Sequence, residues 1–298
     1  MTEMKDVAAL ISELTTAEGY TRTVLDDVTL FRAEKPVPAM PLVYEQCLCI
    51  AVQGDKVTHT DNGVVDYDPS RYLVVPTIVP FHCEALNPER QPLFGLTIDI
   101  DYAVIQDILE TMGEQYRQAT ENMAPSPGMY TQDADPEMIE SLHRLVKSLR
   151  NENDAAVLGR QMIREIYYRA LMGDKGHILA AAAQGESAYA KVAKSIRTIH
   201  DNFADPLDVN GLAETANMSV RSFHDHFKAA TACTPFQYLK RIRLDKARQL
   251  LVRKGLQANV TAHMVGYEST SQFSREFKKH FGYPPRDAVE NFPANMAQ

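Results

Sequence analysis

The segment GYESTSQFSREFKKHFGYPP at residues 266–285 decides the fold of the C-terminal third of the chain. Phe273, Phe277 and Phe281 recur at every fourth position, which is the spacing of one face of an α-helix. A helix that buries this face presents polar and basic side chains on its other faces, as expected of a surface that meets a charged partner. These residues include Ser274, Arg275, Lys278 and Lys279.

The ends of this helix are marked by residues with known positional preferences. Gly266 can adopt a positive φ in a tight turn, and Ser269 or Ser271 can cap the first helical turn. Gly282, followed by two prolines, ends the helix. The sequence therefore predicts one helix with a turn on either side.

A second copy of this pattern lies upstream, so that residues 209–235 (the first copy) and 258–285 (the second copy) form an internal repeat. Phe223, Phe227, Lys228 and Pro235 recur 50 positions later as Phe273, Phe277, Lys278 and Pro285. Val209, Ala213 and Met218 recur 49 positions later as Ala258, Ala262 and Tyr267. One extra residue therefore enters the turn of the second copy. Each copy predicts a helix-turn-helix, in which the second helix enters the major groove of DNA.

The charge of the chain is divided unevenly. Residues 187–298 contain 16 Lys and Arg against 10 Asp and Glu, whereas residues 1–186 contain 15 against 29, and the whole chain carries −8. A basic segment behind an acidic one indicates a polyanionic partner for the C-terminal part alone.

The N-terminal part changes from helix to strand and back to helix. Residues 3–14 predict an amphipathic helix, and short apolar or alternating runs from 19 to 100, with a hairpin turn at Asp61-Asn62-Gly63, predict a small antiparallel barrel or sandwich able to hold a small ligand. Residues 136–151 and 154–173 predict a helical hairpin with Asp154 as an N-cap, which we take as a candidate dimer surface. The Gly- and Ala-rich residues 173–188 predict an interdomain linker.

No apolar run is long enough for a membrane span, and the N-terminus lacks the pattern of a secretory signal. The four cysteines, Cys47, Cys49, Cys83 and Cys233, form neither a disulfide framework nor a CxxC metal motif. These observations predict a cytoplasmic protein that does not bind membranes.

The segment RIRLDKARQLL at 241–251, followed by VGYESTSQFSREFKKHFGYPP at 265–285, resembles the paired helix-turn-helix domain of the AraC/XylS family of bacterial transcription regulators. Upstream, YEQCLCIAVQGDK, YDPSRYLVVP and FGLTIDID resemble the cupin-like sensing domain of one branch of that family. The resemblance implies an α+β protein: a cupin-like antiparallel β-barrel with flanking helices, then an all-α double helix-turn-helix domain held by a long helix over 236–251. The expected division is a sensing and dimerisation domain at 1–172, a linker at 173–188 and a DNA-binding domain at 189–298.

The resemblance also implies roles for individual residues. Base contacts are expected from Arg221, His224, Asp225, Thr270, Ser271, Ser274 and Arg275, and phosphate contacts from Ser219, Lys228, Lys240, Arg241, Arg243, Lys278 and Lys279. The first copy departs from the pattern because it has Ala232 where the second has Gly282. If Ala232 adopts a positive φ, the strain costs about 1 kcal/mol, and the first copy is then the weaker reader of DNA.

The strand region offers candidates for an effector site. Cys47 and Cys49 share one face of a strand, but the alternation with Leu48 and Ile50 does not decide which face lines the interior. Cys49 is a candidate reactive thiol, although a buried, inert cysteine is the simpler interpretation. His59, His82 and Glu84 lack the His-x-His pattern of metal-binding cupins, so no metal or cofactor is expected. The candidate pocket residues are Tyr44, Cys49, Tyr72, Phe81 and His82.

The sequence thus predicts a sequence-specific transcription regulator, an activator controlled by a small-molecule effector in the N-terminal barrel. Its expected partners are double-stranded DNA, the effector, a second copy of itself and, for an activator, RNA polymerase. Three alternatives stay open: a constitutive regulator whose barrel only dimerises, a sensor of electrophiles through Cys49, and a cupin enzyme with a DNA-binding tail. We expect no enzymatic activity.

Overall fold

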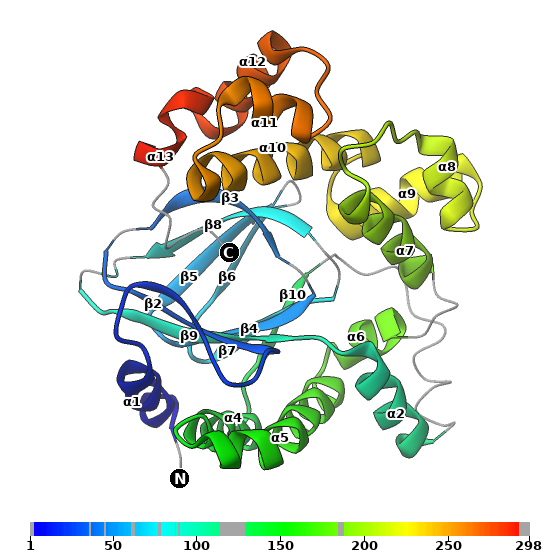
Figure 1. Ribbon diagram of the computed structural model, residues 1–298. Helices are drawn as coiled ribbons and strands as arrows, with labels where there is room; N and C mark the ends of the chain where they lie inside the picture. The colour runs from blue at the N-terminus through cyan, green and yellow to red at the C-terminus, as the bar shows by residue number, and fades with distance from the viewer. Residues whose placement is uncertain are drawn as a thin grey trace.

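The computed structural model describes residues 3–35, 37–44, 46–60, 63–76, 79–86, 88, 90–113, 129–183 and 188–291 (Figure 1). An N-terminal part of strands and helices is followed by an all-helical C-terminal part, which packs at one end of the molecule. No helix within these ranges is both long enough and apolar enough to span a membrane.

The strands form two antiparallel sheets. The six-stranded sheet has the order β1 (Gly19–Arg22), β2 (Val28–Ala33), β9 (Leu93–Asp99), β4 (Cys47–Gln53), β7 (Arg71–Val75) and β10 (Tyr130–Asp133). The four-stranded sheet has the order β3 (Val37–Tyr44), β8 (Val79–Leu86), β5 (Asp55–Thr60) and β6 (Gly63–Tyr67). Between β4 and β5 the chain passes from the six-stranded to the four-stranded sheet at Gly54, which has a φ of 79°.

The predicted antiparallel β-fold is confirmed, but the described strands do not close into one hydrogen-bonded barrel. The predicted hairpin is also confirmed, because β5 and β6 pair with Thr60 opposite Gly63; residues 61 and 62 of its turn lie outside the described residues.

The two faces of β4 pack into different cores, which settles the alternation that the sequence left open. Leu48 and Ile50 belong to a core with α1 (Met4–Leu14), α4 (Pro136–Ser148) and α5 (Glu152–Met172). Cys47 and Cys49 face the second sheet and contribute to a separate core, which we call the inter-sheet core. It consists of Phe31, Ala33, Cys47, Cys49, Ala51, Tyr67, Leu73, Val75, Cys83, Leu93 and Met129.

The helices that follow the strands differ from the sequence prediction in two places. The N-cap of α5 is Asn151, which accepts hydrogen bonds from the backbone N–H groups of Asn153 and Asp154, rather than Asp154 itself. The interval predicted as a linker contains helix α6 (Gly176–Ala183), which is largely buried and contacts α5 and α2 (Tyr102–Met112). Alanine is both a strong helix former and small enough for close packing, so the alanine-rich run joins the N-terminal core.

The C-terminal part is built around one long helix, α10 (Pro235–Lys254), which exceeds the predicted 236–251 at both ends. One end of α10 packs against α7 (Ala188–Asp201), α8 (Val209–Thr215) and α9 (Val220–Thr231), and the other against α11 (Ala258–Met264), α12 (Thr270–Phe281), η1 (Pro285–Asp287) and α13 (Ala288–Asn291) (Figure 1). Each end has its own apolar core. The double helix-turn-helix architecture is therefore confirmed.

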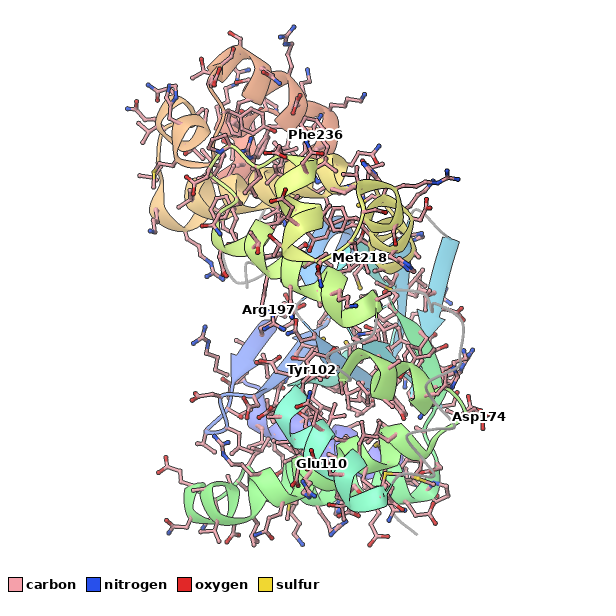
Figure 2. All side chains as sticks on the ribbon, turned by 90° about the vertical axis from the view of Figure 1, so that its right-hand side faces the viewer. Tyr102, Glu110, Asp174, Arg197, Met218 and Phe236 are labelled. Carbon is pink, nitrogen blue, oxygen red and sulfur yellow. The ribbon has the colours of Figure 1, made fainter. Side chains whose placement is uncertain are left out.

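The two parts of the molecule touch through the four-stranded sheet and through the contact of α6 with α7, on the side of the molecule that Figure 2 shows. Helix α10 contacts β3 and β8, and α9 also contacts β8. Helices α4 and α5 lie at the opposite end of the molecule, beyond the six-stranded sheet (Figure 1). The surface predicted for dimerisation is thus far from the helices predicted to bind DNA.

Candidate nucleic-acid interface and effector region

The turns of the two copies have the same backbone geometry. Asn217 and Gly266, which are equivalent in the repeat, both adopt a positive φ, of 51° and 83°. The next residue then donates its N–H to the carbonyl of the central alanine of the preceding helix, at 3.0 Å in the first copy and 2.9 Å in the second. The extra residue predicted for the second copy follows this turn and precedes the N-cap of α12. The repeat read from the sequence is therefore a structural repeat.

The helices after these turns, α9 and α12, begin in the same way. Ser219 and Ser269 are their N-caps, and each hydroxyl accepts a hydrogen bond of 3.3 Å from a backbone N–H three residues later. Of the two caps predicted for α12, Ser269 is thus the one used. We call α9 and α12 the recognition helices because each is the second helix of its motif.

The recognition helices bury their phenylalanines and turn the predicted base-contacting residues outward. Phe223 and Phe227 in α9, and Phe273 and Phe277 in α12, are fully buried, with ring centroids 5.3 and 5.5 Å apart within each pair. All seven predicted base-contacting side chains keep access to solvent. Arg221, Asp225, Ser271 and Arg275 are exposed, whereas His224, Thr270 and Ser274 are half-buried.

The predicted phosphate contacts fall into two groups. Ser219, Lys228, Lys278 and Lys279 are exposed on or beside the recognition helices, and Arg241 is half-buried on α10. Lys240 instead pairs with Glu276, with Nζ 3.1 Å from Oε2. The guanidinium of Arg243 donates to three backbone carbonyls rather than pointing into solvent. We therefore omit Arg243 from the phosphate contacts that we propose below.

Glu276 is a residue that the sequence reasoning missed. Its carboxylate accepts a hydrogen bond of 2.9 Å from the Tyr267 hydroxyl and one of 3.3 Å from the Gln272 amide, besides pairing with Lys240. Burial raises the pKa of Glu276, but these partners outweigh burial and lower it below its usual value. The cluster ties α12 to α10 and to the turn before it. The first copy has Met218 and His226 at the equivalent positions, so the repeat itself gave no signal for the cluster.

The C-terminal ends of the recognition helices differ as the sequence predicted. Ala232 and Gly282 occupy equivalent C-cap positions, both in the left-handed region, with φ of 63° and 84°. A β-carbon is disfavoured in this region because it approaches the following carbonyl oxygen. The first copy therefore contains backbone strain that the second avoids.

Replacing Ala232 by glycine should raise the free energy of unfolding by about 1 kcal/mol, since glycine adopts this conformation without the β-carbon clash. Gly282→Ala is the matched control and should lower stability by a similar amount, because a β-carbon there meets nothing within 4 Å and only the backbone conformation is tested. Chemical denaturation of both variants measures the effect. Equal midpoints for Ala232→Gly and the unchanged protein would contradict the strain.

The inter-sheet core holds polar groups that the sequence did not single out. The Cys49 sulfur lies 3.0 Å from the Tyr67 hydroxyl. Between the sheets the Lys56 residue is 6% exposed, and its ammonium group lies 4.5 Å from the centre of the Phe31 ring. Burial opposes the charged form, but the Cys49 and Cys83 thiols and the Tyr67 phenol favour it, and the pKa of Lys56 is raised well above its usual value. A lysine enclosed in this way is uncommon in protein cores.

The structure does not bring all the predicted pocket residues together. Cys49 lies in the inter-sheet core, but Tyr72 points to the opposite side of the sheet, where its hydroxyl accepts a hydrogen bond of 2.6 Å from the Gln132 amide. Successive residues of a strand alternate between faces, so Leu73, not Tyr72, faces the second sheet. The side chains of Tyr44, Phe81 and His82 lie outside the described part of the structure.

Neither reactive thiols nor a metal site is favoured in the described N-terminal part. Cys49 is fully buried, and burial raises the pKa of Cys83 despite the nearby Lys56. A thiol reacts as its thiolate, so both features oppose reaction with an electrophile. His59 pairs with Glu84 at 2.7 Å, and the described residues contain no cluster of three His, Cys, Asp or Glu suited to a metal ion.

Comparison with known proteins agrees with this architecture. Residues 24–178 match the model of the AraC-type transcriptional regulator N-terminus, and residues 212–291 match a helix-turn-helix domain. The transcriptional activator RhaS of Citrobacter koseri is 28% identical over 151 residues, which are 50% of this chain and 53% of RhaS. RhaS of Escherichia coli O6:H1 is 25% identical over 233 residues, covering 77% of this chain and 70% of RhaS. The chain thus spans about half the length of the first of these relatives.

A solved structure shares the whole fold. ToxT from Vibrio cholerae, bound to (E)-4-(8-methylnaphthalen-1-yl)but-3-enoic acid, superimposes with a TM-score of 0.58 at 11% identity, covering 92% of this chain and 99% of ToxT. At this identity the likeness concerns the fold alone. Because the N-terminal family model matches more than half of the sequence and the helix-turn-helix model matches the C-terminal part, the chain belongs to the family of AraC-type transcriptional regulators.

Proposed function

We propose that the protein is a cytoplasmic, sequence-specific DNA-binding activator of transcription that responds to a small-molecule effector and works with RNA polymerase. The observation that carries the proposal is the duplicated helix-turn-helix, in which α9 and α12 expose equivalent polar and basic faces over buried phenylalanines. Membership of a family of transcription regulators and the activator relatives support the same function, and they disfavour a cupin enzyme.

In this proposal the recognition helices read bases and the surrounding cations hold phosphates. Arg275 can form two hydrogen bonds with a guanine edge, and Ser271 or Thr270 can bond several bases. Asp225 can accept a hydrogen bond from cytosine or orient Arg221. Lys228, Lys278 and Lys279 fix the position of the helices without reading sequence.

Arg275→Ala should weaken binding to the preferred site by about 1–3 kcal/mol and relax the preference at one base pair. Lys279→Ala, four residues further along the same exposed face, should weaken binding to all DNA and reduce the salt dependence. A site selected from random DNA with the purified protein, followed by titration on single-base variants at several salt concentrations, separates the two effects. Equal losses on specific and random DNA for Arg275→Ala would refute its role as a base reader.

We further propose that the effector binds in the N-terminal part, beside the inter-sheet core. The enclosed Lys56 supports this location, because its ammonium group can interact with an acidic ligand, and ToxT structures of the same fold are described with an unsaturated fatty acid and a butenoic acid. A ligand raises thermal stability according to its concentration relative to its dissociation constant. Screening carboxylic acids and their amides against the full chain and Lys56→Met tests the location. If no compound changes the melting temperature or DNA affinity, the constitutive regulator is the better proposal.

The protein also acts as a homodimer in this proposal, through the outer face of α5. Val157, Leu158, Tyr168 and Met172 are exposed by 68, 40, 38 and 53%, and their spacing places them on one side of the helix. Val157→Glu should therefore shift the protein from dimer to monomer at micromolar concentration, as measured by sedimentation equilibrium. Glu152→Lys at the start of the same helix is the control and should leave the dimer intact. A monomeric unchanged protein at high micromolar concentration would remove the dimer from the proposal.

A further inference from the structure

The middle of α10 is the joint between the two helix-turn-helix units. Tyr238 and Ile242 pack into the first apolar core, whereas Leu244 and Leu251 pack into the second. Phe203, in the loop between α7 and α8, packs against both cores. The relative position of α9 and α12 therefore depends on what holds this loop against α10 and against the second unit.

Arg243 occupies this joint, between the last α10 residue of the first core and the first α10 residue of the second. Its Nε donates a hydrogen bond of 2.7 Å to the carbonyl oxygen of Phe203, and its Nη2 donates one of 2.9 Å to that of Asp205. Its Nη1 donates one of 3.1 Å to the carbonyl oxygen of Gly266. One planar side chain thus connects α10, the loop of the first unit and the turn of the second.

The loop and the turn are also in direct contact. A β-carbon on Gly266 would lie 2.4 Å from the carbonyl oxygen of Ala204, so the two backbones approach as closely as glycine allows. Arg243 bonds to the residues on both sides of Ala204 and to Gly266 itself. The close backbone contact and the three hydrogen bonds of Arg243 therefore both hold the loop and the turn in one relative position.

We infer that Arg243 is a positioning residue that sets the distance and angle between the two recognition helices, and through them the spacing of DNA elements that the protein accepts. The inference rests on the proposed DNA-binding function. Adding one base pair between two elements moves the second by about 3.4 Å and turns it by about one-tenth of a helical turn, so a rigid joint rejects altered spacings. If Arg243 were instead a flexible side chain that contacts a DNA phosphate, it would not restrict the spacing between the two DNA elements.

A measurement without DNA tests the joint itself. Glu214 and His263 are exposed, hold equivalent positions in the two copies, and can be replaced by cysteines for spin labels, since the four native cysteines are buried. Distances between the labels should follow one narrow distribution with Arg243 and a broad one with Arg243→Gln. Arg243→Lys keeps the charge but cannot serve three carbonyls in a plane, and it should broaden the distribution as well. A distribution that stays narrow in both variants, with unchanged melting temperatures, would overturn the inference.

Binding to DNA tests the consequence. A site selected with the unchanged protein is rebuilt with one or two base pairs inserted or removed between its two elements. When the spacing changes by one base pair, we expect the affinity of the unchanged protein to fall about 100-fold. The affinity of Arg243→Lys should fall less than about tenfold for the same change in spacing. Arg241→Gln, the control for lost charge, should weaken all spacings alike.

The outcomes separate the inference from the function on which it rests. If Arg243→Lys and Arg243→Gln keep the spacing preference and weaken every site equally, Arg243 is a phosphate contact and the inference is wrong. If no sequence is enriched by the unchanged protein, the DNA-binding function fails, while the spin-label distances still decide the role of Arg243 in the joint.

Discussion

Replacing Gly266 by alanine should lower the free energy of unfolding of the C-terminal part by about 3 kcal/mol and abolish specific DNA binding. Two costs combine in this estimate. The φ of 83° costs a residue with a β-carbon about 1–2 kcal/mol, and relief of the overlap with the Ala204 carbonyl requires a backbone shift that costs about 1–3 kcal/mol. The shift would also displace the carbonyl oxygen that accepts a hydrogen bond from Arg243.

The variant Gly282→Ala separates the cost of the positive φ from the cost of the overlap with the Ala204 carbonyl. Its φ of 84° is nearly the same, but a β-carbon there has no neighbour within 4 Å. The difference between the two variants in chemical denaturation therefore measures the close approach of the loop and the turn. Equal losses of stability in Gly266→Ala and Gly282→Ala would show that the contact with Ala204 has no energetic importance.

Replacing Phe277 by alanine should lower stability by about 4 kcal/mol, the range found for buried phenylalanines, and should unfold the second unit selectively. The ring is fully buried, and its centroid lies 4.6 Å from that of Phe281 and 6.0 Å from that of Tyr283. The core around it is small and separate from the core of the first unit. We therefore expect α11 and α12 to lose protection while α8 and α9 keep theirs.

Hydrogen exchange of backbone amides reports this difference helix by helix. Phe227→Ala is the matched variant in the first copy and should give the opposite pattern. Phe281→Ala, in which the ring removed is only half-buried, should have a smaller effect than Phe277→Ala. Loss of protection in all four helices from either variant would show that the two cores unfold as one.

The features that the sequence predicted correctly are those determined within a few residues of chain. Caps such as Ser269, the positive φ of Gly266 and Ala232, and the four-residue spacing of the phenylalanines depend on local backbone geometry. The repeat strengthened these predictions, because each position could be compared with its equivalent. The order of strands within each sheet and their division into two separate sheets were not accessible, since they depend on pairing between distant segments.

The residues whose surroundings the sequence did not reveal share a physical cause. Arg243 and Lys240 have the side-chain chemistry of phosphate contacts, but their partners in the structure come from residues 23 to 40 positions away in the sequence. Lys56 lies in an ordinary strand pattern, and it is enclosed only because the six-stranded sheet, with Phe31 of β2, packs over it. Tyr72 was assigned to the pocket by residue type, whereas the alternation along β7 turns it to the other face. Tertiary partners, not local pattern, decide such roles.

The contact between α9 and β8 connects the first recognition helix directly to the four-stranded sheet. Lys56 of β5 pairs in register with Ala85 of β8, and β8 in turn contacts α9. Only one strand therefore lies between the strand of Lys56 and the first recognition helix. The first copy is also the one with backbone strain at its C-cap. In the proposed function, an effector bound beside the inter-sheet core would therefore act on the first recognition helix through β5 and β8, whereas the Glu276 cluster ties α12 to α10.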